Sequence, residues 1–283
     1  MNELVIFSLV NLTIIRLVGF GISLHYYFET KRKAHIYFMI GWLVFSLAPI
    51  PPIFSGLTNE VYLSQMFLLL NGILVSVGFL YITSGYFSYF IKIPKIIFLI
   101  LTPIFISLPI ILYFGLGIKI ALNCSIFTYN AFLMGAFIIP VLKWENFKET
   151  VSKSIGLYFI NLGILLIFIP ISLFNILQGY SYGLYESNDV FLISINYTFG
   201  IISMILMIIY FLHLELTISN REKGNLKDKY SHNLGNILQT VYLSIGLLKQ
   251  KKEIDLKERI DLVELIEKKI NQAEKFLNEI RII

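Results

Sequence analysis

The chain has 283 residues, of which 57% are hydrophobic and 14% charged, and its formal net charge at pH 7 is +5. An ordinary soluble domain carries about 25% charged residues, so this composition excludes that class of protein. Of the 23 basic and 18 acidic residues, 17 lie in residues 1–214 and 24 in residues 215–283. The sequence therefore predicts a lipid-embedded body followed by a water-exposed tail.

Residues 1–214 contain seven apolar stretches that approach or exceed the roughly 20 residues a helix needs to cross a bilayer. In chain order, the predicted spans are Leu4–Tyr27, Ala34–Phe54, Val61–Phe90, Ile96–Phe114, Ile118–Leu142, Ser154–Gln178 and Val190–Leu214. Backbone polar groups in lipid must bond within their own segment, so we expect helices rather than strands. The chain starts without the basic n-region of a cleavable signal peptide, so the first span is expected to stay.

The loops between these spans differ in their content of Lys and Arg. Eight basic residues follow the first, third and fifth spans: Lys31, Arg32, Lys33, Lys92, Lys95, Lys143, Lys148 and Lys153. The alternate loops hold one, Lys119. Because cytoplasmic loops carry the excess of Lys and Arg, we expect a multi-pass protein of the cell membrane, with its N-terminus outside and its C-terminal tail in the cytoplasm.

Polar side chains inside the spans are costly in lipid, which makes them the first candidates for a ligand site. The candidates are one charged residue, Arg16, and the amides Asn71, Asn130, Asn161 and Asn196. They could line a small-molecule cavity in which the guanidinium contacts an anion. Alternatively, Arg16 snorkels or bonds to neighbouring carbonyls, and the asparagines join helix to helix. No metal site is predicted.

Other features of the spans bear on the class of membrane protein. Pro49, Pro51 and Pro52 near the end of the second span predict a kink, which could hold a cavity open. A retinal protein needs a lysine for its Schiff base, and Val190–Leu214 contains none. A transporter built on inverted repeats would show paired, interrupted spans in two halves, and the sequence shows no convincing repeat.

The tail predicts two helices that each carry one narrow apolar stripe. The first stripe has heptad spacing and consists of Leu234, Leu238, Val241, Ile245 and Leu248. The second has a period of about 3.4 residues and consists of Leu256, Ile260, Val263, Ile266, Ile270, Ala273, Leu277 and Ile280. The short polar stretch Lys249–Asp255 between them predicts an antiparallel hairpin. Such a hairpin buries little, so we expect two copies to form a four-helix bundle.

One histidine of the tail lies in a recognisable motif. At about 100° per residue, His232 lies about 160° from the stripe at Leu234, so its ring is expected to be exposed. The segment Ser231–Gln239 resembles the histidine box of sensor histidine kinases. It matches that pattern at Ser231, His232, Leu234, Asn236 and Leu238, and departs from it at Asn233, where the family usually has Glu or Asp, and at Ile237, where Pro is frequent.

This resemblance implies a membrane sensor of a phosphorelay in a two-component system. Its parts would be a seven-helix sensor domain (1–214), a linker or signalling helix (215–230) and a dimerisation and histidine-phosphotransfer hairpin (231–283). His232 would be the phosphoacceptor, and Asn236 would position water for dephosphorylating the receiver domain of a response regulator. Asn233 stands in place of the acidic base and cannot accept a proton, which favours phosphotransfer or phosphatase activity over autokinase activity.

The resemblance also sets expectations for cofactors and partners. Residues 1–283 contain no glycine-rich nucleotide lid and no Asn-containing box of a kinase ATPase domain. No cofactor is therefore predicted in the chain, and ATP with Mg²⁺ is expected only through an ATPase domain, either in a longer kinase of which this is a fragment or in a separate subunit. The expected partners are a second copy, a receiver domain and the lipid bilayer, without nucleic acid.

A second interpretation of the chain stays open beside the phosphorelay sensor. In it, the protein is a non-enzymatic seven-helix receptor or transporter with a dimerising coiled-coil tail, and His232 has no special role. In the phosphorelay interpretation, the signal passes from the seventh span into the tail. Gly224 and Asn225 lower helix propensity on that route, and we expect a hinge there.

Overall fold

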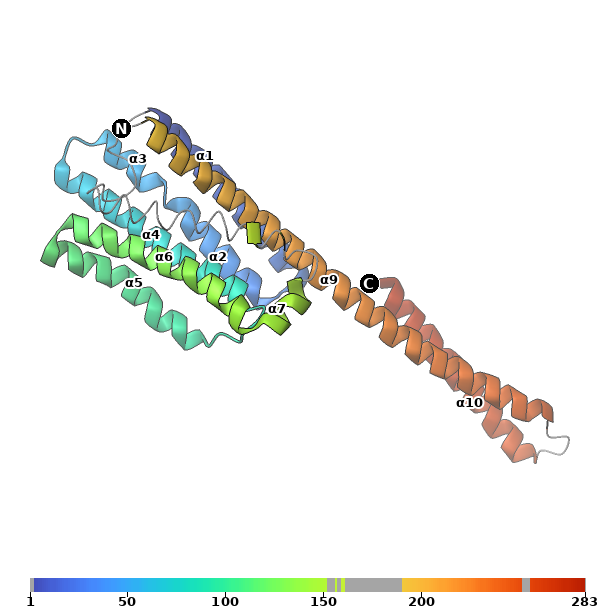
Figure 1. The fold of residues 1–283 in the computed structure, drawn as a ribbon. Coiled ribbons are helices and arrows are strands. Elements are labelled where there is room, and N and C mark those ends of the chain that lie inside the picture. Colours follow the sequence, from blue (N-terminus) through green and yellow to red (C-terminus); the bar gives the residue numbers. More distant parts are fainter. Residues whose placement is uncertain (1–2, 152–155, 157–158, 161–189, 251–254, 283) are drawn as a thin grey trace. The chain divides into compact units, whose positions relative to one another are not determined.

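The computed structural model describes residues 3–151, 156, 159–160, 190–250 and 255–282. These residues form helices joined by short connections, with no strand among them (Figure 1). The chain divides into two compact units, Met1–Leu214 and Glu215–Ile283. We call the first unit the body and the second the tail.

The body contains α1 (Glu3–Thr30), α2 (Lys33–Leu47), α3 (Ile50–Leu57), α4 (Val61–Phe87), α5 (Lys95–Leu116), α6 (Ile118–Leu142), α7 (Trp144–Val151) and the first part of α9 (Val190–Gln250). The tail contains the rest of α9 and α10 (Leu256–Ile282). In the described part of the chain, five segments are long and apolar enough to cross a membrane: Glu3–Thr30, Lys33–Leu57, Val61–Phe87, Lys95–Leu116 and a stretch within Ile193–Lys249.

These five segments coincide with the first four and the last of the predicted spans. The fifth predicted span forms α6, of which the described apolar part is the shorter segment Ile118–Thr128. The sixth, Ser154–Gln178, lies almost wholly outside the described residues. The all-helical body with several potential membrane helices is thus confirmed, and the number of seven spans stays a prediction.

The second predicted span is divided into two helices at the expected kink. α2 ends at Leu47, and α3 begins at Ile50 with prolines in its first turn. A helical N–H normally donates to the carbonyl four residues earlier, and proline has no N–H. Pro49 therefore leaves the carbonyl of Phe45 without its i+4 donor, and Pro52 does the same to the carbonyl of Ala48.

Close packing of α2 against α4 depends on two glycines. A Cβ added at Gly41 would lie 2.6 Å from the backbone nitrogen of Ile82, and one added at Gly78 would lie 2.8 Å from Cβ of Phe45. Small residues let membrane helices approach this closely. The contact holds large rings in the centre of the body, where Phe38, Trp42 and Phe45 are buried.

The first part of α9 packs into the same core. Its buried residues Met204, Met207, Ile208 and Phe211 belong to one cluster with buried residues of α1, α2 and α4. In Figure 1, this part of α9 (gold) runs beside α1 (blue). The apolar face of the last predicted span is therefore covered by protein on one side.

Helix α9 is not interrupted at Gly224 and Asn225, where the sequence predicts a hinge. α9 is one helix of 61 residues that continues through both positions. A glycine costs about 1 kcal/mol relative to alanine inside a helix, and an asparagine less. That penalty is small beside the hydrogen bonds of the many turns on either side, so helix propensity alone does not place a break here.

Candidate functional site

The predicted phosphoacceptor lies on the part of α9 that belongs to the tail. His232 is exposed, as its helical position predicts, and Asn236 lies one turn further on the same face. Nδ2 of Asn236 is 3.2 Å from Nδ1 of His232. The hydroxyl of Thr240 donates to the backbone carbonyl of Asn236 at 2.9 Å. The imidazole therefore has one ring nitrogen in contact with a carboxamide.

The buried face of this helix differs from the predicted apolar stripe by one residue. Ile237 and Ser244 are buried, at 5% and 4% exposure, whereas Leu238 is 58% exposed and Ile245 is also exposed. A stripe through Ile237 and Ser244 has the same heptad spacing as one through Leu238 and Ile245. The sequence favours the second because serine is polar, whereas the structure buries the first. Within one copy of the tail, the predicted stripe is therefore exposed at these two positions, and its place in a four-helix bundle stays a prediction.

His232 is turned away from this packed face. It is five residues from Ile237, which corresponds to about 140° around the helix. Asn233, at the position of the family's acidic base, is half-buried. The helix thus presents His232 and Asn236 together on a face separate from the one that packs within the tail.

Arg16 lies deep in the body and joins three helices. Its side chain is 7% exposed, and its guanidinium lies 3.5 Å from the ring centroid of Phe45. Nη1 donates to the carbonyl of Phe45 at 2.9 Å, and Nε to the sulfur of Met204 at 3.4 Å. The Phe45 carbonyl is the one whose i+4 donor is missing because of Pro49. Arg16 therefore stabilises the kink between α2 and α3 and contacts α9.

Asn71 plays a matching part from α4. Its buried side-chain amide donates to the carbonyl of Ala48, whose i+4 donor is missing because of Pro52. Both contacts are the helix-joining kind that the sequence left open as an alternative to a ligand site. Asn130 lies on α6 and Asn196 on α9, where their side chains are not described, and Asn161 lies outside the described residues.

The sequence did not single out a polar cluster at the end of α1 and the start of α2. His35 is fully buried, with Nδ1 2.8 Å from the hydroxyl of Thr30 and Nε2 3.3 Å from that of Tyr89. The rings of Tyr26 and Phe211 each lie 5.8 Å from its ring. In the sequence, His35 lies just inside the second predicted span, and this position could have indicated a buried polar contact. The basic residues Lys31, Arg32 and Lys33 before it indicate a loop instead.

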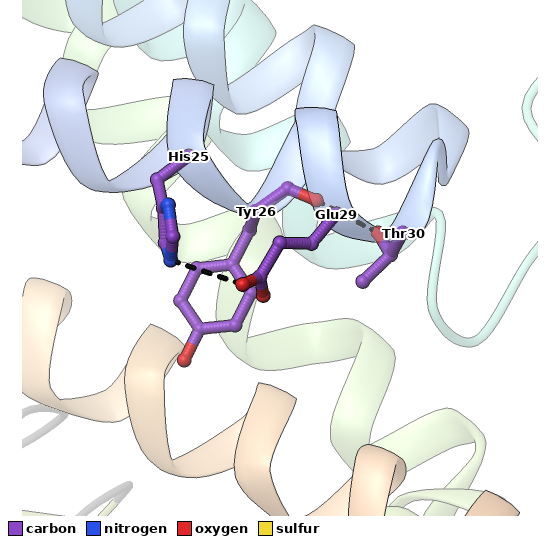
Figure 2. A network of polar contacts seen from close by, with 4 residues as sticks. All are labelled: His25, Tyr26, Glu29 and Thr30. Atoms are coloured by element: carbon purple, nitrogen blue, oxygen red, sulfur yellow. Dashed lines mark hydrogen bonds and ion pairs between the residues drawn. The ribbon is translucent and has the colours of Figure 1, made fainter. Parts of the chain in front are cut away.

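Two further contacts lie near this cluster. The hydroxyl of Tyr86 on α4 donates to the carbonyl of Met207 on α9 at 2.8 Å. On α1, Nε2 of His25 lies 3.4 Å from a carboxylate oxygen of Glu29, one turn later, and both side chains are exposed (Figure 2). The first contact ties α9 to the body, and the second is a helical surface pair.

Comparisons with protein-family models, with curated proteins and with solved structures find no match to this chain. Within the described residues, no group of three His, Cys, Asp or Glu side chains is placed to hold a metal ion. The candidate site is the exposed imidazole of His232, a possible nucleophile, with the amide of Asn236 in contact with one of its ring nitrogens.

Proposed function

We propose that this chain is the membrane sensor of a phosphorelay and that His232 is its phosphoacceptor. The observation that carries the proposal is the position of His232, exposed and in contact with Asn236, on the same continuous helix that packs into the core of the body. The resemblance of Ser231–Gln239 to the histidine box supports the same assignment. We further propose seven spans, an external N-terminus and a cytoplasmic tail.

The contacts of α9 supply a route for the signal. Arg16 contacts Met204, Tyr86 bonds to the carbonyl of Met207, and Phe211 packs against the ring of His35. All three contact points lie on the buried stripe of α9. A rearrangement of α1, α2 or α4 would therefore shift or rotate this helix, and a continuous helix carries such a movement to His232.

We propose that two copies of the tail form a four-helix bundle. Leu238, Tyr242 and Ile245 are exposed on one face of α9, about 115° around the helix from the packed residues Ile237 and Ser244. α10 also exposes an apolar stripe, formed by Leu256, Ile260, Val263, Ile270 and Leu277. The half-buried residues Leu262, Ile266 and Ala273 lie about 85° around the helix from that stripe. A helix with two apolar faces at this angle suits a bundle, in which each helix packs against two neighbours.

The chemistry proposed for the tail is reversible phosphoryl transfer. Phosphate would come from ATP with Mg²⁺ held by a kinase ATPase domain and would pass to the receiver domain of a response regulator. Asn236 would position water during dephosphorylation of that receiver. Asn233 supplies no general base, so we expect transfer and phosphatase activity to exceed autokinase activity.

The test is labelling of His232. Incubated with a sensor-kinase ATPase domain and ATP, or with a phosphorylated receiver domain, the full chain is expected to gain a phosphate that is labile in acid and stable in base. His232→Gln should remove the label without changing helicity, because the side chain is exposed. His25→Gln, at another exposed helical histidine, is the matched control and should keep it.

The contrary result is equally clear. The proposal fails if the wild-type chain stays unlabelled with partners that label an established sensor kinase in the same assay. That result would favour the non-enzymatic receptor or transporter, for which His232 is an ordinary surface residue.

A further inference from the structure

We infer that the starts of α2 and α5 form a binding site for the headgroup of an anionic phospholipid, with Lys33 and Lys95 as its cationic side chains. Both lysines are exposed, and within the described part of the chain neither takes part in an ion pair. Their ammonium groups are therefore available to a ligand. The inference concerns the body alone and does not depend on the role of His232.

The directions of the helices place both lysines at one end of the body. The two close glycine contacts between α2 and α4 show that these helices are antiparallel, because the later position on α2 meets the earlier position on α4. α5 is also antiparallel to α4. Near the start of α5, the ring of Phe98 lies 5.1 Å from that of Tyr81, whereas near its end the hydroxyl of Tyr113 donates to Oε1 of Gln65 at 3.2 Å. α2 and α5 therefore begin at the same end.

A stack of three aromatic rings holds these two helix starts together. Phe98 of α5 stacks with Tyr37 of α2 at a centroid distance of 4.7 Å, and with Tyr81 of α4. Lys33 comes four residues before Tyr37 on α2. Lys95 comes three residues before Phe98 on α5. Residues three or four apart are neighbours on a helix surface, so each lysine lies one turn before a ring of the stack. The two ammonium groups can thus approach the same anion.

Carboxylates are scarce around the two lysines. Residues 30–144 contain one acidic side chain, Glu60, which precedes α4 and so lies at the other end of that helix. Glu29, at the end of α1, is paired with a histidine of its own helix. Glu145 and Glu149 lie on α7, which follows α6. The surface at the two helix starts is therefore positively charged, and the phosphate of a lipid headgroup can accept charge-assisted hydrogen bonds from both ammonium groups.

The apolar surface beside the lysines identifies the occupant as a lipid. Ile96, Leu99 and Ile100 near the start of α5 are exposed, Leu99 by 70%. Of the five potential membrane segments, α5 is the least buried, at 11% of its apolar stretch. Basic pockets between membrane helices bind anionic headgroups in this way, since lysines at helix ends extend to the membrane surface. The acyl chains would cover the exposed face of α5 while the phosphate contacts Lys33 and Lys95.

Lys31 provides a matched control in the same connection. It lies two residues before Lys33, but its Nζ is 4.7 Å from the ring centroid of Phe28 and 5.0 Å from that of Tyr27. Its charge is thus directed to the rings of α1. Lys31→Gln removes the same charge from the chain as Lys33→Gln does, without changing a side chain of the proposed site.

The experiment measures lipid binding to the full chain in an uncharged detergent by native mass spectrometry. Dioleoyl phosphatidylglycerol should bind in preference to dioleoyl phosphatidylcholine, which has the same acyl chains and no net charge. Lys33→Gln and Lys95→Gln should each weaken binding of phosphatidylglycerol about fivefold, and the double variant about 30-fold, as expected for two lysines that act on one headgroup. Lys31→Gln should leave this binding unchanged. Both site lysines are exposed, so circular dichroism should show an unchanged helix content.

Three outcomes would overturn the inference. Equal binding of the two lipids would show that the site does not recognise the anionic headgroup. An equal loss for Lys31→Gln and Lys33→Gln would show a general attraction between charges in place of a site. Displacement of the lipid by inorganic phosphate, at the concentration at which the lipid itself binds, would show a site for a free anion. Each outcome differs from failure of the proposed function, which appears as missing label on His232 in the tail.

Discussion

At the scale of single residues, the kink between α2 and α3 explains why polar side chains are buried in an apolar body. Proline at 49 and 52 removes two i+4 donors. Arg16 donates to the carbonyl of Phe45, which also accepts the backbone N–H of Ala48, and Asn71 donates to the carbonyl of Ala48. An unsatisfied carbonyl in lipid costs several kcal/mol, so these contacts offset the burial of the polar side chains. The sequence indicated both the prolines and the polar residues. It could not show that the polar side chains donate hydrogen bonds to the carbonyls whose i+4 donors the prolines remove.

This pairing predicts a rescue. Asn71→Leu should destabilise the body by about 1–3 kcal/mol, because the carbonyl of Ala48 loses a donor. Pro52→Ala restores a backbone N–H at the position that bonds to this carbonyl, so the same Asn71→Leu change should cost less in that background. Thermal unfolding in detergent would measure all four proteins of the cycle.

The control for this cycle is Asn11→Leu. Asn11 is half-buried, and its amide donates to a carbonyl of its own helix in a solvent-exposed hydrogen bond, so its replacement is expected to have little effect. Equal losses for Asn71→Leu with and without Pro52 would show that the amide does not serve the proline kink.

At the scale of elements, apolar length and periodicity predicted some features and missed others. The bounds of α1, α4 and α5 lie within about three residues of the predicted spans, because a long apolar run in lipid has no alternative to a helix. A break in the helix at Gly224 and burial of Leu238 within one chain are not observed. Both depend on a small local preference that the whole helix or its packing partner overrides.

Helix packing in the body gives a second prediction. Gly41→Ala should lower the melting temperature, because its Cβ would lie 2.6 Å from a backbone nitrogen of α4, which cannot move aside as a side chain can. Overpacking of this kind typically costs about 1–3 kcal/mol. Gly21→Ala is the matched control, because a Cβ there meets nothing within 4 Å and alanine favours the helix. Equal melting temperatures for the two variants would contradict the close approach of α2 and α4.

At the scale of the whole molecule, a body of apolar helices and a charged helical tail share one helix, α9. The sequence predicted that His232 is exposed, because it lies about 160° from the predicted stripe. The packed face at Ile237 is shifted by one residue, but it is still about 140° from His232, so the ring stays exposed. The sequence could not predict which nitrogen Asn236 contacts, because spacing places two side chains on one face without fixing their atoms. In the tail, α9 has one face that packs within the chain, at Ile237, and another that we propose packs between copies, at Leu238. The sequence pattern assigned both kinds of packing to Leu238.

That separation makes dimerisation testable with three substitutions in the full chain, measured by analytical ultracentrifugation in detergent. Leu238→Asp places a charge on an exposed residue of one chain, so the tail should stay helical. In the proposed bundle the same charge would be buried and unpaired, which costs about 3–5 kcal/mol and should weaken the dimer at least 100-fold. Leu243 is also exposed but lies about 140° around the helix from Leu238, outside the proposed contact, so Leu243→Asp should leave the dimer intact. Ile237→Asp should instead reduce helicity, because Ile237 is buried within one chain. A dimer that tolerates Leu238→Asp, or that is equally sensitive to Leu243→Asp, would place the contact between copies on a different face.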